Sequence, residues 1–168
     1  MTLTPRFRDV GADTLLICRT NQRVLWTDAS FKNGISGWAV VEEETCLHYD
    51  WERGLTSNLA EGVAIRDALR ILQGGSGIVL TDSSSWSRAL NGEGNMKGGA
   101  ANRVMEECRS MLHPSLAVRW VPSHTKHLTG NILADQYAKH ARIHQESISQ
   151  SSTLAPPMSS EEVALVIQ

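Results

Sequence analysis

Apolar positions divide residues 23–142 into alternating short and long runs. Three short runs rich in β-branched and aromatic side chains come first, and turn residues separate them: residues 23–28, 37–43 and 46–51. Runs of this length and composition predict β-strands. Because the connections between them are short, we expect the three strands to form an antiparallel meander.

The next part of the pattern predicts helices that alternate with two more strands. Residues 57–72 carry apolar side chains at helical spacing, and glycines 74 and 75 follow them. Residues 77–82 form a continuous apolar run, which is typical of a central strand with both faces covered. The pattern then predicts a short helix, a glycine-rich loop, a helix, a strand and a last helix: residues 83–90, 91–99, 100–112, 116–121 and 128–142.

This order predicts an α/β fold with a five-stranded mixed sheet, half antiparallel and half parallel, flanked by helices. A chain of 168 residues is long enough for one such domain with tails. We expect an N-terminal extension at 1–22, the domain at 23–144 and a flexible tail at 145–168, where serine and proline are frequent. Residues 14–18 (TLLIC) fit an extra edge strand or the end of an upstream domain.

Charge and cysteine content indicate the cellular compartment of the protein but do not identify its binding partner. The net charge of −2 and the pI near 6.3 show no overall excess of positive charge for nucleic acid, and they leave room for a local one. Three widely separated cysteines indicate neither a disulfide framework nor a cysteine zinc site, so a reducing, intracellular compartment fits. No apolar run approaches the roughly 20 residues that span a bilayer, so we expect a soluble protein without a membrane partner.

Four carboxylates interrupt the apolar patterns. Asp28 ends the first strand, Asp82 ends the fourth, Glu61 lies early in the first long helix and Asp135 lies in the last helix. In a strand order 3-2-1-4-5 the first and fourth strands are adjacent and parallel, so Asp28 and Asp82 emerge side by side at the end where α/β sheets bind ligands. Apolar neighbours place Glu61 and Asp135 at the margins of buried helix faces, within reach of the same sheet edge.

Such a group of acids points to divalent cations. Ionised carboxylates that are only a few ångströms apart repel one another, and burial raises their pKa values unless a cation intervenes. Mg²⁺ or Mn²⁺ is favoured over zinc, because no cysteine and at most one histidine is available as a ligand. Two such ions about 4 Å apart form the arrangement that hydrolyses phosphodiesters.

Each acid also has a structural interpretation. Asp28 is compatible with the start of a turn, and Asp82 with the cap of the short helix that follows. Glu61 is compatible with a helix-capping pair with the residue three positions before it. Asp135 is compatible with a surface ion pair to Lys139, four residues later on the same helix. The occurrence of all four acids together favours the metal site.

Five motifs, in order, resemble the type 1 ribonuclease H family, especially the ribonuclease H domains attached to retroelement reverse transcriptases. The resemblance covers about residues 24–142 and is carried by WTDAS, a second strand that contains tryptophan, SNLAE, LTDSSSW and WVPSHTKHLTGNILADQYAKHA. It implies the ribonuclease H-like fold and a metal-dependent endonuclease that cuts the RNA strand of RNA/DNA hybrids and leaves 5′-phosphates. It also implies an intracellular setting, nuclear rather than cytoplasmic.

The resemblance also implies roles for individual residues. Asp28, Glu61, Asp82 and Asp135 correspond to the family's four catalytic acids, which hold two Mg²⁺ ions, with Mn²⁺ as the alternative. His124 corresponds to the mobile-loop histidine that handles protons or helps product leave, and His127 is a competitor for that role. Asn131 corresponds to a structural asparagine at the head of the last helix. Zinc binding by the histidine pairs 124 and 127 or 140 and 144 is an alternative that is not favoured, because these pairs lack partner ligands.

Substrate contacts follow from the same resemblance. Asn58 is expected to contact the minor groove, together with Ser57 and with Ser30 just after the first acid. Arg53 and Thr56 lie in the loop where relatives hold a DNA phosphate. An alternative is that Thr56 or Ser57 caps the helix, and both roles are compatible.

The loop at 91–99 departs from many of the family's cellular members, which carry a basic helical handle there. This segment holds one lysine and no aromatic residue, which predicts weak intrinsic affinity for the hybrid. It favours a domain that relies on a tethered partner, such as a covalently linked reverse transcriptase. Two other functions are weighed: a non-catalytic nucleic-acid-binding module of the same fold, and a DNA nuclease like the transposases and integrases.

Overall fold

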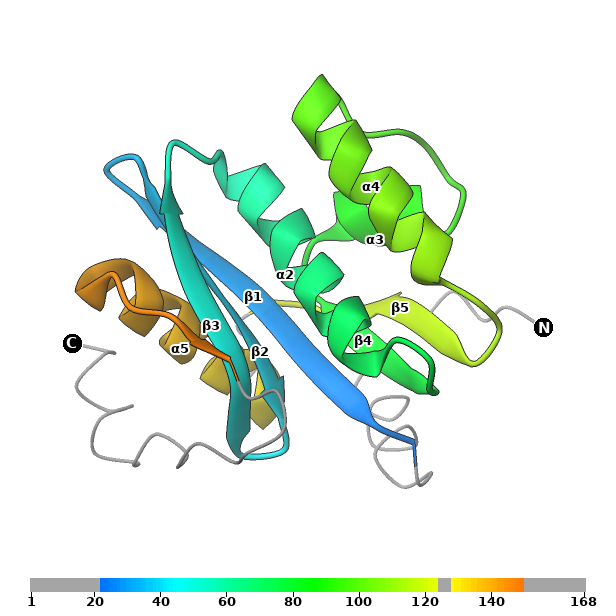
Figure 1. The fold of residues 1–168 in the computed structure, drawn as a ribbon, viewed down its shortest axis with the longest axis horizontal. Helices are drawn as coiled ribbons and strands as arrows, with labels where there is room; N and C mark the ends of the chain where they lie inside the picture. Colours follow the sequence, from blue (N-terminus) through cyan, green and yellow to red (C-terminus); the bar gives the residue numbers. More distant parts are fainter. Residues whose placement is uncertain (1–21, 124–127, 150–168) are drawn as a thin grey trace.

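The computed structural model describes residues 22–123 and 128–149. In this part of the chain six strands and four helices follow one another in the order β1, β2, β3, α2, β4, α3, α4, β5, α5, β6 (Figure 1). The strands span Val24–Lys32, Ile35–Glu42, Thr45–Arg53, Gly77–Thr81, Leu116–Trp120 and Ile148–Ser149. The helices α2, α3, α4 and α5 span Ser57–Leu72, Ser84–Leu90, Gly99–Met111 and Thr129–His144.

The first three strands form the predicted antiparallel meander. A two-residue turn joins β1 to β2, and both of its residues have positive φ angles: 52° at Asn33 and 77° at Gly34. An Asn-Gly pair in this conformation matches the twist of the strands on either side. β1 continues up to this turn and ends at Lys32, four residues beyond its predicted end. Asp28 therefore lies inside the strand.

The sheet has the strand order β5-β4-β1-β2-β3-β6. β1, β4 and β5 run parallel, and the remaining neighbours are antiparallel. The predicted order of the first five strands, 3-2-1-4-5, is confirmed. β6 was not predicted: Ile148 pairs with Tyr49 and Ser149 with His48, in a segment expected to be flexible tail. Residues 14–18, which fit an edge strand or the end of an upstream domain, and the rest of the tail lie outside the described residues.

Helices cover both faces of the sheet (Figure 1). One core cluster joins α2, α3 and α4 to Leu25, Trp38 and Val40, and the other joins α5 to Trp26 and Val41. Neighbouring residues of β1 and β2 thus enter opposite cores, as the two-residue repeat of a strand requires. None of the helices in the described ranges is long and apolar enough to cross a membrane.

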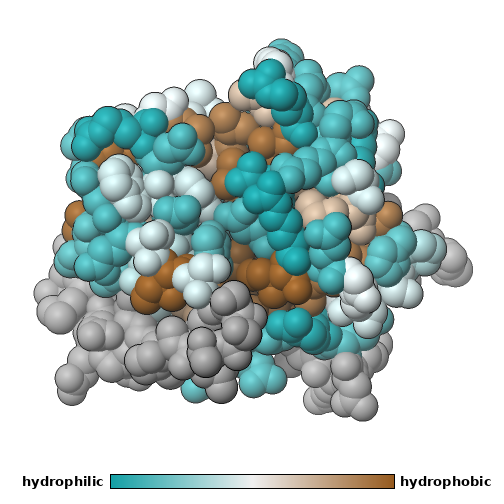
Figure 2. Space-filling view, viewed as in Figure 1, coloured by the Kyte–Doolittle hydropathy of each residue, from teal (hydrophilic) through white to brown (hydrophobic). Residues whose placement is uncertain are grey.

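A groove of about 500 Å³ lies between α2, α4 and the end of β3. Leu55, Leu59 and Val104 line it beside Arg66 and Arg103. Figure 2 shows hydrophobic residues between these two helices, and a second hydrophobic area lower on the same face. The predicted loop before α4 is confirmed, since residues 91–98 contain no helix and three of their glycines have positive φ angles.

Candidate active site

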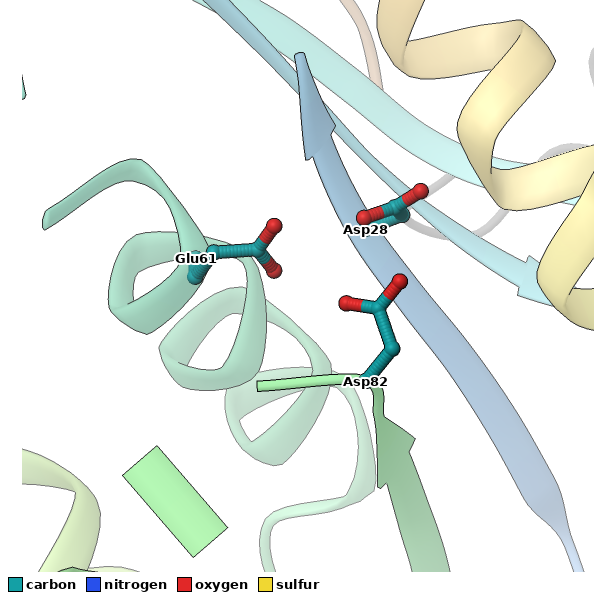
Figure 3. A group of neighbouring side chains, drawn as sticks. All are labelled: Asp28, Glu61 and Asp82. Carbon is teal, nitrogen blue, oxygen red and sulfur yellow. The ribbon is translucent and has the colours of Figure 1, made fainter. Parts of the chain in front are cut away.

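Three carboxylates meet at one end of the parallel strands. Asp28, Glu61 and Asp82 each contribute an oxygen, and these atoms all lie within 4.8 Å of one another. Figure 3 shows the three side chains pointing toward one another from β1, from α2 and from the residue that follows β4. Within the described ranges no other group of three acids, histidines or cysteines is close enough to hold a metal ion.

The strand register brings Asp28 and Asp82 together. Trp26 of β1 is the partner of Leu80 of β4 in the parallel ladder, and each acid follows its ladder residue by two positions. The two acids therefore stand at the same level of adjacent strands, which lie about 4.8 Å apart. Asp28 is paired with Ala39 inside the sheet, so it does not begin a turn, and only 5% of its surface is exposed.

The start of α2 places Glu61 beside the strands. The hydroxyl of Thr56 accepts a hydrogen bond from the Leu59 amide at 3.1 Å and so caps the helix. Thr56 therefore has the capping role that was weighed against phosphate binding. With the cap five residues away, Glu61 is not part of a capping pair. Its position one turn into the helix directs its side chain toward the two aspartates (Figure 3).

Trp86 of α3 supports this turn of α2. Its indole N–H donates to the carbonyl of Asn58 at 2.6 Å, and its ring is fully buried. A Cβ on Gly62 would lie only 2.1 Å from the ring, so only glycine fits beside Glu61. Ser83 caps α3 by accepting from the Trp86 amide, which excludes the cap interpretation of Asp82. Sequence reasoning missed this positioning role, although the tryptophan is part of LTDSSSW.

Burial and mutual repulsion raise the pKa values of the cluster. Burial raises the pKa of Asp28 well above its usual range, and the charges of Glu61, Asp82 and Asp135 raise it further. A 2.9 Å hydrogen bond from the Ala29 amide lowers this pKa by a smaller amount. Burial, followed by the charge of Asp82, raises the pKa of Glu61 to about 8. The enclosed Oε2 of Glu61 has no hydrogen-bond partner within the described part of the chain. A cation among these oxygens would offset both costs.

Asp135 lies next to the cluster on α5. Its charge contributes to the raised pKa values of Asp28 and Glu61. Its own Oδ2 is 3.0 Å from the ammonium of Lys139, which is the ion pair considered as the alternative. The group of three whose oxygens lie within 4.8 Å of one another does not include Asp135. The structure thus gathers three of the four predicted acids and holds the fourth beside them.

The predicted substrate residues come shortly before Glu61 or shortly after Asp28 in the sequence. Ser57 and Asn58 begin α2 and are exposed, and the side-chain oxygen of Asn58 accepts a hydrogen bond from Ser85 at 3.4 Å. Arg53 is exposed at the end of β3. Ser30 is partly exposed in β1, and its hydroxyl accepts a hydrogen bond from Arg142 at 2.9 Å. Their contacts with substrate stay predictions.

The remaining predicted residues divide between α5 and the loop before it. His124 and His127 lie outside the described residues. Asn131 is buried in the first turn of α5, as expected of a structural residue. The rings of His140 and His144 have centroids 4.4 Å apart, and His140 lies 3.3 Å from a Glu146 oxygen. They do not belong to the candidate metal group, so zinc gains no support there.

Comparisons with known proteins show which family model the chain matches and which solved structures share its fold. A family model described as RNase H matches residues 20–143. LC11-RNase H1, isolated from compost by a metagenomic approach, is 22% identical with a TM-score of 0.62, over 75% of this chain and 99% of that chain. The complex of LC11-RNase H1 with an RNA/DNA hybrid gives 19% identity and a TM-score of 0.59, over 74% of this chain and 99% of that chain.

A reverse transcriptase is also similar in fold. The protease-reverse transcriptase of prototype foamy virus is 21% identical with a TM-score of 0.58, and the match covers 80% of this chain and 21% of that chain. At such identities these likenesses show the fold. No curated protein sequence matches the chain.

Proposed function

The chain belongs to the RNase H family, and from that premise we propose that it is a metal-dependent endonuclease that hydrolyses the RNA strand of RNA/DNA hybrids. One observation carries the proposal: Asp28, Glu61 and Asp82, from three separate elements, gather their oxygens within 4.8 Å of one another. Three carboxylates gathered at a partly buried site are costly to maintain without a cation.

The residues of the cluster fit hard divalent cations. All the donors are carboxylate oxygens, which Mg²⁺ and Mn²⁺ prefer, and the enclosed Glu61 Oε2 lacks a partner within the described part of the chain. Asp28, Glu61 and Asp82 would hold two Mg²⁺ ions, or Mn²⁺ in their place, with Asp135 completing the site. When bound, such ions lower the pKa of the attacking water and neutralise charge on the departing 3′ oxygen, which leaves a 5′-phosphate.

Other residues keep the acids and the substrate in position. Thr56 and Trp86 hold the first turns of α2, and Lys139 holds the carboxylate of Asp135. Asn58 and Ser57, exposed beside Glu61, would read the minor groove of the hybrid, where the 2′-hydroxyls distinguish RNA from DNA. Arg53 would hold a DNA phosphate, and His124 would transfer a proton during turnover.

A tethered partner is part of the proposal. Residues 91–98 form a loop with a single lysine, so this segment neutralises few phosphates. A covalently linked reverse transcriptase domain would raise the effective concentration of the hybrid at the acidic cluster. The foamy virus protease-reverse transcriptase supports this arrangement, since the match occupies a fifth of that longer chain.

A cleavage assay tests the function. The protein is incubated with end-labelled RNA/DNA hybrid, double-stranded DNA or single-stranded RNA, each with Mg²⁺, Mn²⁺ or a chelator. We expect cleavage of the RNA strand of the hybrid alone, only with a metal ion, and its loss in Asp28→Asn. Asp50→Asn, the same change at a β3 aspartate outside the cluster, should keep activity. Cleavage of DNA would point instead to an integrase-like nuclease, and binding without cleavage to a non-catalytic module.

A further inference from the structure

Arg142 contacts β1 two residues beyond Asp28, on the face of the sheet that α5 covers. Its Nε donates a hydrogen bond to the hydroxyl of Ser30 at 2.9 Å. Ser30 follows Asp28 by two residues in β1, so both side chains leave the same face of the strand, about 7 Å apart along it. Trp26, two residues before Asp28, packs in the core cluster of α5, which identifies that face.

Close packing of α5 on the sheet sets the place of Arg142. Ser30 is the ladder partner of Gly37 in β2. A Cβ on Gly37 would lie 2.2 Å from the Ala138 carbonyl oxygen and 2.6 Å from the Arg142 amide nitrogen. Because Gly37 has no side chain, the last turns of α5 lie directly on the strand beside Ser30. The guanidinium reaches β1 for that reason.

The guanidinium of Arg142 is available for an anion. Four arginines of the described part are paired with carboxylates: Arg23, Arg66, Arg70 and Arg109. Arg142 belongs to the remaining arginines of that part, which form no ion pair with a carboxylate there. Within the same part, the guanidinium of Arg142 makes its one hydrogen bond to a neutral hydroxyl. A guanidinium has five N–H donors, and its two terminal nitrogens form a fork that matches two oxygens of a phosphate.

We propose that Arg142, oriented by Ser30, binds a backbone phosphate of the strand that is cleaved, one or two nucleotides from the cleaved bond. The inference rests on the proposed function, because it places that strand over Asp28. Phosphates of one strand follow one another at about 3.4 Å along a duplex axis, and their separation in space is larger, so a distance of about 7 Å spans at most about two nucleotides. Arg142 thereby adds a substrate contact on α5 to those expected near Glu61.

A purely structural role is the competing explanation. Arg142 lies in the last turn of α5, where a positive side chain interacts favourably with the helix dipole, and its bond to Ser30 ties α5 to β1. Such a role would change thermal stability. It would not change the salt dependence of hybrid binding, which counts the phosphates that the protein neutralises.

Binding measurements separate the two roles. Hybrid affinity is measured with a chelator present, so that no cleavage occurs, over a series of salt concentrations. We expect Arg142→Gln to raise the Kd about tenfold and to reduce the slope of log K against log salt by about one. Arg142→Lys should restore the slope and only part of the affinity, since lysine keeps the charge without the fork. Arg88→Gln, at the exposed last turn of α3, should change neither.

A substrate-side experiment needs no variant that could fail to fold. Single methylphosphonates are placed along the RNA strand, and the affinity of the unaltered protein should fall at a position within two nucleotides of the cleaved bond. That loss should disappear in Arg142→Gln, because the two changes remove the same contact. An unaltered Kd and slope in Arg142→Gln, or no sensitive position in the scan, would overturn the inference while cleavage still stands. A parent protein that neither binds nor cuts the hybrid overturns the proposed function as well.

Discussion

Trp38 of β2 donates its indole N–H to Oδ2 of Asp67 on α2 across 2.8 Å. His48 of β3 lies 3.1 Å from the same oxygen, and Arg66 and Arg70 lie near the other. This carboxylate, whose side chain is 13% exposed, joins α2 to two strands on the face opposite α5. Since α2 carries Glu61, the network also supports one wall of the acidic cluster.

Replacing Asp67 by a neutral residue should lower the free energy of unfolding and make that free energy less sensitive to acidic pH. Burial pushes the pKa of Asp67 up, but the bonds from His48 and Trp38 and the charge of Arg66 outweigh it, so the pKa lies below its ordinary value. A lowered folded-state pKa gives stability that is complete above the unfolded pKa of about 3.9 and is lost as the pH falls below it. Asp67→Asn should reduce the free energy of unfolding at pH 7 by about 1–3 kcal/mol.

Urea denaturation at pH 7 and pH 3 measures this effect, with Asp50→Asn as the matched control. The difference in stability between Asp67→Asn and the parent should shrink at pH 3. An equal difference at both pH values would contradict the role of the Asp67 charge.

Filling the space at Gly62 should damage both stability and catalysis. In Gly62→Ala the new methyl group would overlap the Trp86 ring, so α2 and α3 must separate and Glu61 must shift. Overpacking of this kind costs about 1–3 kcal/mol. Gly75→Ala is the control, because its Cβ would meet only the Leu72 carbonyl at 3.4 Å. Thermal denaturation and initial cleavage rates measure the two effects, and a Gly62→Ala protein with parental values for both would refute the supporting role of Trp86.

Local sequence patterns predicted most of the helices and strands. The features that sequence reasoning missed depend on a very short strand or on contacts between residues far apart in the sequence. The helix at 57–72 was predicted with its observed bounds because sixteen residues contain more than four turns of periodic signal. β6 has two residues and therefore no period to detect. The parallel pairing of β1 and β4 explains why Asp28 and Asp82 could be predicted to meet. The approach of α5 to Gly37 and the bond from Trp38 to Asp67 join residues far apart in sequence, and no local pattern encodes them.

The cap of α2 allows the two roles of Thr56 to be separated. Thr56→Ala should lower the free energy of unfolding by about 1 kcal/mol, since the Leu59 amide loses its side-chain acceptor. Thr56→Ser should keep that stability, because serine caps as well as threonine does. Ser57→Ala, next to the cap, is the stability control. If Thr56→Ala also reduces the salt slope of hybrid binding, Thr56 contacts a phosphate as well; if Thr56→Ala is as stable as the parent, the cap assignment fails.

The last prediction concerns the cost of ionising Glu61 without a metal ion. Its pKa of about 8 lies above the value of about 4.3 in an unfolded chain, so between these values the folded state binds more protons and stability falls as the pH rises. The Tm measured with a chelator should therefore drop from pH 5 to pH 9, and Mg²⁺ should raise the Tm at pH 9 more than at pH 5.

Glu61→Gln should flatten the pH dependence of the Tm and weaken its response to Mg²⁺, because the amide of glutamine carries no charge. Glu52→Gln, at the exposed end of β3, should behave as the parent. A parent Tm that rises from pH 5 to pH 9 with the chelator, or that ignores Mg²⁺ at both pH values, would show that the cluster does not hold ionised carboxylates around a cation.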